Sequence, residues 1–365
     1  MRMSPIYDST EHHERDIFLT EICESGDVLR RTAGRLREQR RALHEVRHRL
    51  AGRRLILTGM GSSADAVTGL ASVLGRSGRE STVINTAELL HFRLASLTDQ
   101  HGVIIVSQSG HSVEAVKLMN ALTKDRAIPV VVVTNMADSP LADAADFAIT
   151  LGAGVEVGPS SKTYVATMLV MQVLAELLAC DDEVETVLAR AGHRADVAAN
   201  ALAAWIGDAE GVGGRLADWI EKAQSLFVVG RGVGVTAAEL NALVLKESAH
   251  VPAQSMDAAE FRHGPLELAA PGLAVALICV EPSVAALDAR LRTDLLSRGA
   301  AVMTIGIDAC RTDDLPIDYV LPGSEPLIDA GLIALPLLLA AWAEASRRSE
   351  TPGAFSVGAK VTTCE

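Results

Sequence analysis

Short apolar runs along this chain alternate with longer segments in which apolar residues recur at helical spacing. Residues 102–106 are apolar throughout, which is typical of a strand buried on both faces. Residues 113–122 place apolar side chains on one helical face. Strands and helices in this order predict an α/β fold with parallel sheets. Further strands are predicted at 54–58, 82–85, 130–134 and 147–150, and a long apolar helix at 163–178.

The second half of the chain repeats the pattern of the first. Three pairs of segments correspond at an offset of about 171 residues, namely 55–61 with 225–232, 103–109 with 274–280, and 130–135 with 301–306. A repeat of this length indicates a duplicated α/β domain. The predicted organisation is an N-terminal helical segment (1–50), two domains (51–205 and 206–348) and a C-terminal tail (349–365).

Two helices are predicted before the first strand, at 17–36 and 37–50. The second is rich in arginine, with glutamates and histidines interspersed, which favours a solvated face over a nucleic-acid contact. The net charge of −13 also argues against nucleic acid as a partner. With 49% hydrophobic and only 3% aromatic residues, the core consists mainly of Ala, Leu and Val, which suits helices on parallel strands.

Several classes of protein are not expected from this sequence. The five cysteines are scattered without a CxxC pair, so we predict no disulfide framework, no metal site and a reducing, cytoplasmic compartment. No apolar signal core follows Met1, and no uninterrupted apolar run reaches the roughly 18 residues of a membrane span. Residues 327–342 come closest, but Pro336 favours a buried helix. Gly59 and Gly61 lack the third glycine and the acidic ribose partner of a dinucleotide site, so NAD binding is not expected. We predict no cofactor.

A loop of small polar residues joins the strand ending at 106 to the helix starting at 113. Its sequence is Ser107-Gln108-Ser109-Gly110-His111-Ser112, and we call it the serine loop. Free N–H groups in the first helical turn and the helix dipole favour an anion there, and Gly110 lets the backbone approach it. The alternative is an ordinary capped turn. The corresponding loop of the second half contains Glu281 and no glycine, so phosphate binding is predicted for the first half only.

The second half offers candidates for acid–base chemistry. Glu247 ends a largely apolar helix, and His263 stands in a Gly-Pro turn. Each alone is more often a surface charge or a satisfied loop histidine, but together they form a candidate acid–base pair. The tail from 351 to 365 has no helical pattern and on its own is typical of a disordered end, with Lys360 as a weak hint of function.

These motifs, in this order and spacing, resemble the double sugar isomerase (SIS) proteins. That family includes the isomerase half of glucosamine-6-phosphate synthase, amino-sugar-phosphate deaminases and fructosamine-phosphate deglycases. The resemblance runs from about residue 21 to the end of the chain. It is carried by the serine loop together with Ser160-Ser161-Lys162, Gly230-Arg231-Gly232, Leu245-Lys246-Glu247 and His263-Gly264-Pro265.

The resemblance implies two flavodoxin-like parallel sheets related by pseudo-two-fold symmetry, in a homodimer without a metal or cofactor. It implies that Glu247 moves a proton between C1 and C2 of a sugar phosphate. It also implies that His263, from the partner subunit, assists ring opening, and that Lys360, with five residues after it as in the family, corresponds to the synthase's Schiff-base lysine. The implied substrate-binding residues are Ser63, Ser107, Gln108, Ser109, Ser112, Gly158 and Ser160.

Three departures from the family pattern shape the expected activity. The sequence has no glutaminase domain and no N-terminal cysteine nucleophile, so glutamine-dependent amino transfer is not expected of this chain alone. Val244 replaces a frequent lysine, and the Gly158-Pro159 pair suggests an altered sugar pocket. The sequence therefore predicts a sugar-phosphate isomerase or deaminase, with glucosamine 6-phosphate as the preferred substrate. A fructosamine-phosphate deglycase and a non-catalytic sugar-phosphate-binding regulator are the alternatives.

Overall fold

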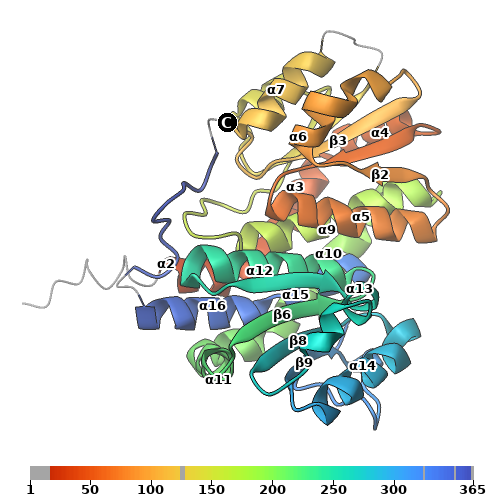
Figure 1. Cartoon of the computed structure of the whole chain (residues 1–365). Helices are drawn as coiled ribbons and strands as arrows, with labels where there is room; N and C mark the ends of the chain where they lie inside the picture. Colours follow the sequence, from red (N-terminus) through yellow and green to blue (C-terminus); the bar gives the residue numbers. More distant parts are fainter. Residues whose placement is uncertain (1–16, 124–127, 324, 349–350, 363–365) are drawn as a thin grey trace, which may run out of the picture.

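Two parallel five-stranded sheets, one above the other in Figure 1, form the framework of the molecule. The computed structural model describes residues 17–123, 128–323, 325–348 and 351–362. The strand orders are β2-β1-β3-β4-β5 and β10-β9-β8-β6-β7, the flavodoxin-like order in both sheets. The strands are β1 (Arg54–Thr58), β2 (Ser81–Val83), β3 (His101–Val106), β4 (Val130–Thr134), β5 (Phe147–Thr150), β6 (Ser225–Gly230), β7 (Ala253–Asp257), β8 (Leu273–Cys279), β9 (Ala301–Ile307) and β10 (Tyr319–Leu321).

The predicted α/β duplication is confirmed, because each strand of the first sheet has a counterpart in the second. The strands predicted from apolar runs are present, with the strand predicted at 82–85 lying one residue earlier and shorter, at Ser81–Val83. The sequence did not single out β7 and β10. Both lie at the edges of their sheet, where a strand needs no continuous apolar run, since one side lacks a neighbouring strand.

The helices of the first half cover both faces of the first sheet. The N-terminal region forms three helices rather than the predicted two, with a break around Glu24. Helix α3 packs on α9 and α10, so this region belongs to the core. The helices are α2 (Ile17–Cys23), α3 (Ser25–Glu38), α4 (Arg40–Leu50), α5 (Ser62–Arg76), α6 (Thr86–Glu88), α7 (Val113–Leu122), α8 (Pro140–Ala144), α9 (Lys162–Ala179) and α10 (Val184–Gly207).

The two halves meet through a layer of helices, in which α5 packs against both α9 and α12 (Figure 1). Gly69 of α5 makes this approach possible, because an added Cβ would lie 2.8 Å from a methyl group of Leu327 and 3.0 Å from one of Thr236. The second half contributes α11 (Ala209–Glu221), α12 (Gly234–Ala249), α13 (Ala258–Arg262), α14 (Ala285–Ser297), α15 (Pro326–Ile333) and α16 (Leu335–Arg348).

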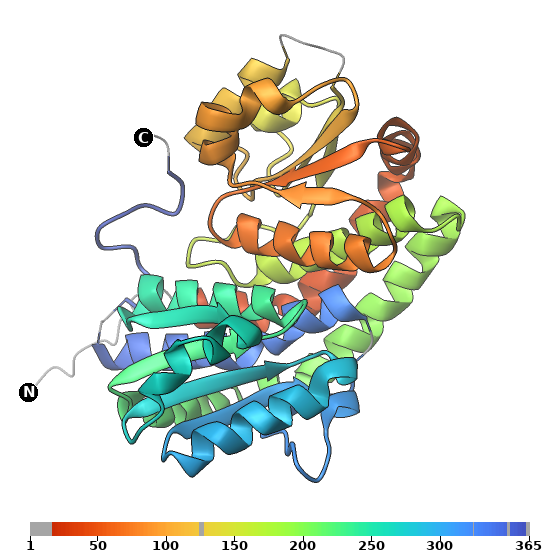
Figure 2. The ribbon, with the colours of Figure 1, turned by 45° about the vertical axis from the view of Figure 1, so that its right-hand side comes forward.

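Over the described ranges, two stretches of helix are long and apolar enough to cross a membrane, Lys162–Ala179 and Pro326–Arg348. In these stretches, 83% and 89% of an apolar 18-residue window is buried inside the protein, as expected of core helices in a duplicated α/β fold. The prediction of a buried helix around 327–342 is therefore confirmed. After α16, the chain leaves the second domain and runs along the outside of the molecule toward the first (Figure 2).

Candidate functional site

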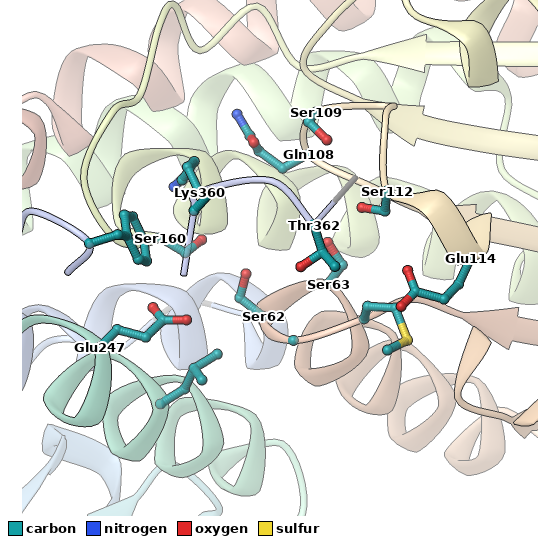
Figure 3. Close-up of a pocket in the computed structure, with 15 residues that line it drawn as sticks. Ser62, Ser63, Gln108, Ser109, Ser112, Glu114, Ser160, Glu247, Lys360 and Thr362 are labelled. Atoms are coloured by element: carbon teal, nitrogen blue, oxygen red, sulfur yellow. The ribbon is translucent and has the colours of Figure 1, made fainter. Parts of the chain in front are cut away.

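A cavity of about 200 Å³ lies between the two halves, at the carboxyl ends of β1 and β3. Adjacent strands in this order form the switch point of the first sheet, where α/β proteins commonly bind ligands. Both domains and the tail contribute to its walls (Figure 3). The lining residues are Met60, Gly61, Ser62, Ser63, Gln108, Ser109, Ser112, Glu114, Ser160, Leu243, Glu247, Phe355, Ala359, Lys360 and Thr362.

One wall of the cavity is built from uncharged hydrogen-bond donors at two helix N-termini. Ser62 and Ser63 begin α5, and Ser112 is the N-cap residue of α7. The side chain of Ser112 makes no capping hydrogen bond, so its hydroxyl is available to the cavity, unlike that of an ordinary capping serine. Two helix N-termini beside several hydroxyl groups make a site suited to a phosphate group.

Ser107 and Gly110 shape the serine loop from behind. The Ser107 hydroxyl lies 3.2 Å from the Ser112 hydroxyl, so Ser107 orients Ser112 and does not itself line the cavity. Gly110 has φ +66°, and an added Cβ would collide with the Ser139 side chain. The predicted glycine requirement of this loop therefore has two causes, positive φ and close packing.

Glu247 lies on the opposite wall, in the last turn of α12. Burial raises the pKa of its carboxyl, while the nearby charges of Lys360 and Lys246 oppose the rise. A carboxyl with a raised pKa, facing a cavity, is suited to taking and returning a proton. Val244, one turn earlier on α12, is fully buried and does not face the cavity.

The tail is ordered across the mouth of the cavity up to residue 362, contrary to the expectation from its composition alone. The carbonyl oxygen of Thr362 accepts a 3.1 Å hydrogen bond from the backbone N–H of Val113, at the start of α7. The Lys360 ammonium donates to a carboxylate oxygen of Glu156 at 2.7 Å and to the carbonyl of Gly158 at 2.6 Å. Gly158 therefore contacts the site through Lys360 and does not line the cavity.

His263 does not reach this cavity within one chain. It follows α13 and is exposed in the second domain. The resemblance places this histidine in the site of a partner subunit, and a single chain does not test that prediction. Ser63, Gln108, Ser109, Ser112, Ser160, Glu247 and Lys360 are the predicted residues that the fold brings together around the cavity.

The turn after β6 in the second domain corresponds to the turn after β1 in the first. A side chain of the second domain itself occupies it. The carboxylate of Glu281 accepts a 3.1 Å hydrogen bond from the backbone N–H of Val233 and forms an ion pair with Arg76 of α5. Gly232, with φ +54°, leaves the room that this carboxylate occupies. The Glu281 carboxylate thus occupies the position where the first domain has free hydrogen-bond donors. This agrees with the prediction of a phosphate site in the first half only.

Several site residues were not predicted. Ser62 adjoins a predicted residue in the same helical turn, and Thr362 lies two positions after Lys360, so both could have been found by proximity. Glu114 and Glu156 carry no such signal, because an acid within a helix or between two valines usually faces solvent. Among the described residues, no group of three or more His, Cys, Asp or Glu side chains could hold a metal ion.

The sequence of residues 51–177 matches the SIS domain family model. This match covers most of the first domain, and the second domain, outside the match, has the same strand order. The chain is 28% identical over 354 residues to glutamine–fructose-6-phosphate aminotransferase (isomerizing) of Pyrobaculum aerophilum, covering 95% of this chain and 57% of that protein. It is 27% identical over 264 residues to the Pyrococcus horikoshii protein of the same name, covering 70% and 42%. The chain spans about half the length of these curated relatives.

Solved structures show the same fold. The C-terminal domain of glucosamine-fructose-6-phosphate aminotransferase from Francisella tularensis aligns with a TM-score of 0.78 and 17% identity, over 90% of this chain and 95% of that chain. Tagatose-6-phosphate ketose/aldose isomerase from Escherichia coli aligns at 0.76 and 20%, over 97% and 98%. Glucosamine-6-phosphate deaminase from Thermotoga maritima aligns at 0.68 and 17%, over 95% and 98%. The chain therefore shares its fold with these three solved structures.

Proposed function

We propose that this protein is an enzyme that isomerises a phosphorylated hexose derivative, and that it releases ammonia from glucosamine 6-phosphate. The observation that carries the proposal is one small cavity with two chemically different walls (Figure 3). Serine hydroxyls and helix N-termini form one wall, and Glu247 with Lys360 forms the other. A ligand with a phosphate at one end and a carbonyl at the other matches both walls.

The wall formed by serine hydroxyls and helix N-termini, which we call the serine wall, supports binding of the phosphate end. The chain has a net charge of −13, so a phosphorylated substrate is not attracted by the protein as a whole. Local donors must supply the affinity, and helix N–H groups and hydroxyls do so without adding formal charge. The sugar then extends from the serine loop toward α12.

Glu247 supports proton transfer at the carbon end. In an open-chain 2-amino-2-deoxy aldose, a carboxylate removes the proton from C2 and returns it to C1. The electron pair from the broken C2–H bond forms the C1–C2 double bond of an enolamine, while the electron pair of the C1 carbonyl double bond moves to its oxygen, which takes a proton from water. Protonation at C1 then draws the nitrogen lone pair into a C2–N double bond, and the resulting iminium loses a proton to the hydroxide to give an imine at C2. Water then hydrolyses this imine to a ketose phosphate and ammonia. One carboxylate held over both carbons by a rigid helix serves both transfers.

The proposed activity is tested by turnover of glucosamine 6-phosphate by the purified full chain. We expect ammonia and fructose 6-phosphate in equal amounts. Glu247→Gln should bind the sugar phosphate with unchanged affinity and lose turnover by about 1,000-fold, the usual worth of general acid–base catalysis. The same assay with fructosamine 6-phosphate and fructose 6-phosphate separates deglycase and isomerase activities. Binding without turnover of any of the three would contradict the proposal and favour a regulator.

A further inference from the structure

The carboxylate of Glu156 joins the tail to the body of the first domain. It lies in the loop between β5 and α9, and its side chain is 0% exposed. Oε1 accepts from the Ser161 backbone N–H at 3.0 Å, the Ser161 hydroxyl at 3.1 Å and the Thr163 N–H at 3.0 Å. Oε2 accepts from the Thr163 hydroxyl at 2.6 Å and from Lys360 Nζ at 2.7 Å.

Four of these five donors belong to the N-terminal turn of α9 or to its N-cap residue Ser161. Burying a carboxylate is costly unless hydrogen bonds replace its water, and a helix N-terminus is a favourable place for one. The four donors therefore fix Glu156 independently of the tail. The fifth donor, Lys360, is the group that Glu156 in turn holds.

Lys360 needs such a partner because its side chain is long and flexible. Holding a lysine head group in one place costs side-chain entropy. Glu156 and the Gly158 carbonyl together provide two acceptors, at 2.7 Å and 2.6 Å, which restrict the amine to one side of the cavity. Ser160 of the same loop lines the cavity beside it.

We propose that Glu156 is the positioning residue for Lys360, and that it holds the amine where the carbonyl carbon of a ketose phosphate arrives. The inference rests on the proposed function and adds to it that Lys360 forms an imine with the ketose phosphate. In that step the ammonium of Lys360 and the C2 carbonyl give an iminium and water. The nitrogen–carbon bond forms, and the carbonyl oxygen leaves with two of the ammonium protons. The positive charge stays on the same nitrogen, so Glu156 pairs with it before and after the reaction.

The test is reductive trapping of the iminium with borohydride in the presence of fructose 6-phosphate, followed by mass spectrometry of the peptide that contains Lys360. We expect an adduct on Lys360 in the wild-type protein. Glu156→Gln should form it 10- to 100-fold more slowly, since a misplacement of about 1 Å commonly costs on the order of 100-fold. Glu156→Asp keeps the charge and should recover part of the rate.

Glu24→Gln is the matched control. Glu24 pairs with Lys162, the first residue of α9, at 2.6 Å, but it does not contact Lys360. This variant should trap the sugar at the wild-type rate. The affinity for sorbitol 6-phosphate, which has no carbonyl, should be equal in all four proteins because it depends on the serine wall. A loss of that affinity in Glu156→Gln and Glu156→Asp would indicate a merely structural role and overturn the proposal.

A second readout needs no substrate. Reductive methylation of Lys360 with formaldehyde should be faster in Glu156→Gln than in wild type and Glu24→Gln, because the amine is released. Equal trapping and equal methylation in wild type and Glu156→Gln would refute the positioning role while leaving the proposed function intact. Faster methylation without any adduct in the wild type would refute imine formation and leave the contact between Glu156 and Lys360 supported. Should Glu156→Gln not fold, Glu156→Asp provides both comparisons.

Discussion

At the scale of residues, two carboxyl groups face each other between the domains, one helical turn from the cavity. An added Cβ at Gly61, the N-cap residue of α5, would lie 3.8 Å from Leu243, and one at Gly69 would lie 3.0 Å from Thr236. Asp65, midway between the two glycines, therefore lies opposite Glu239. Within the described part of the chain, one oxygen of each carboxyl is buried without a hydrogen-bond partner.

This pair predicts a stability that depends on pH. Burial and then the charges of Glu239 and Glu247 raise the pKa of Asp65 well above its usual range, against the opposing charge of Lys246. Burial also raises the pKa of Glu239. The folded protein therefore binds protons more tightly than the unfolded chain, and the free energy of unfolding decreases as the pH rises through the raised pKa values.

The measurement is urea unfolding between pH 5 and pH 8. Asp65→Asn should flatten the decrease in stability over this range, since asparagine does not titrate. Glu210→Gln, which changes an exposed acid on α11, should leave it unchanged. An equal slope in wild type and Asp65→Asn would show that the carboxyl pair does not cause the dependence.

At the scale of elements, the same turn from strand to helix is used in two ways. The turn after β1 contributes to the open serine wall, whereas the turn after β6 is closed by Glu281. Arg76, in the last turn of α5, pairs with that carboxylate, so the closed turn also fastens the first domain to the second.

Removal of this internal anion should weaken the contact between domains. Glu281→Ala leaves the Val233 N–H and the Arg76 guanidinium without a partner, and we expect a loss of about 2 kcal/mol in the free energy of unfolding. Glu267→Ala, at an exposed acid of the same domain, should have little effect. Urea unfolding measures both, and equal stability of the two variants would refute a structural role for Glu281.

At the scale of the whole molecule, the cavity is complete only where the two domains and the tail meet. The serine loop comes from one domain, Glu247 from the other, and Lys360 arrives along the outside of the molecule (Figure 2). His263 remains outside the cavity of its own chain, and we propose that a second copy of the chain supplies it in a homodimer.

Subunit mixing tests this arrangement. Glu247→Gln and His263→Ala should each be inactive as homodimers. In a heterodimer, one site combines Glu247 of one chain with His263 of the other, so random mixing of the refolded variants should restore about a quarter of the wild-type activity. No recovery, despite heterodimers detected by native mass spectrometry, would contradict a shared site.

The sequence predicts the fold better than the site, for physical reasons. Buried parallel strands such as β3 are continuous apolar runs, so their positions and their duplication could be found by pattern, while the polar edge strand β7 could not. The serine loop was found because several small polar residues follow a strand directly. The tail pattern alone made Lys360 only a weak hint, and the resemblance gave it a role. Its position depends on Glu156, more than 200 residues earlier, and no local pattern encodes such a contact.

The closed turn at Glu281 has a consequence for how the two halves respond to metabolites. Any ligand that binds only the folded protein adds stability that grows with the logarithm of its concentration above Kd. Under the proposed function, bound sugar phosphate stabilises the first domain when its concentration is high, and this stabilisation is lost when its concentration is low. In the second domain, the carboxylate of Glu281 takes the place of such a ligand at all times. Local unfolding at low sugar-phosphate concentration should therefore begin around the empty serine loop of the first domain.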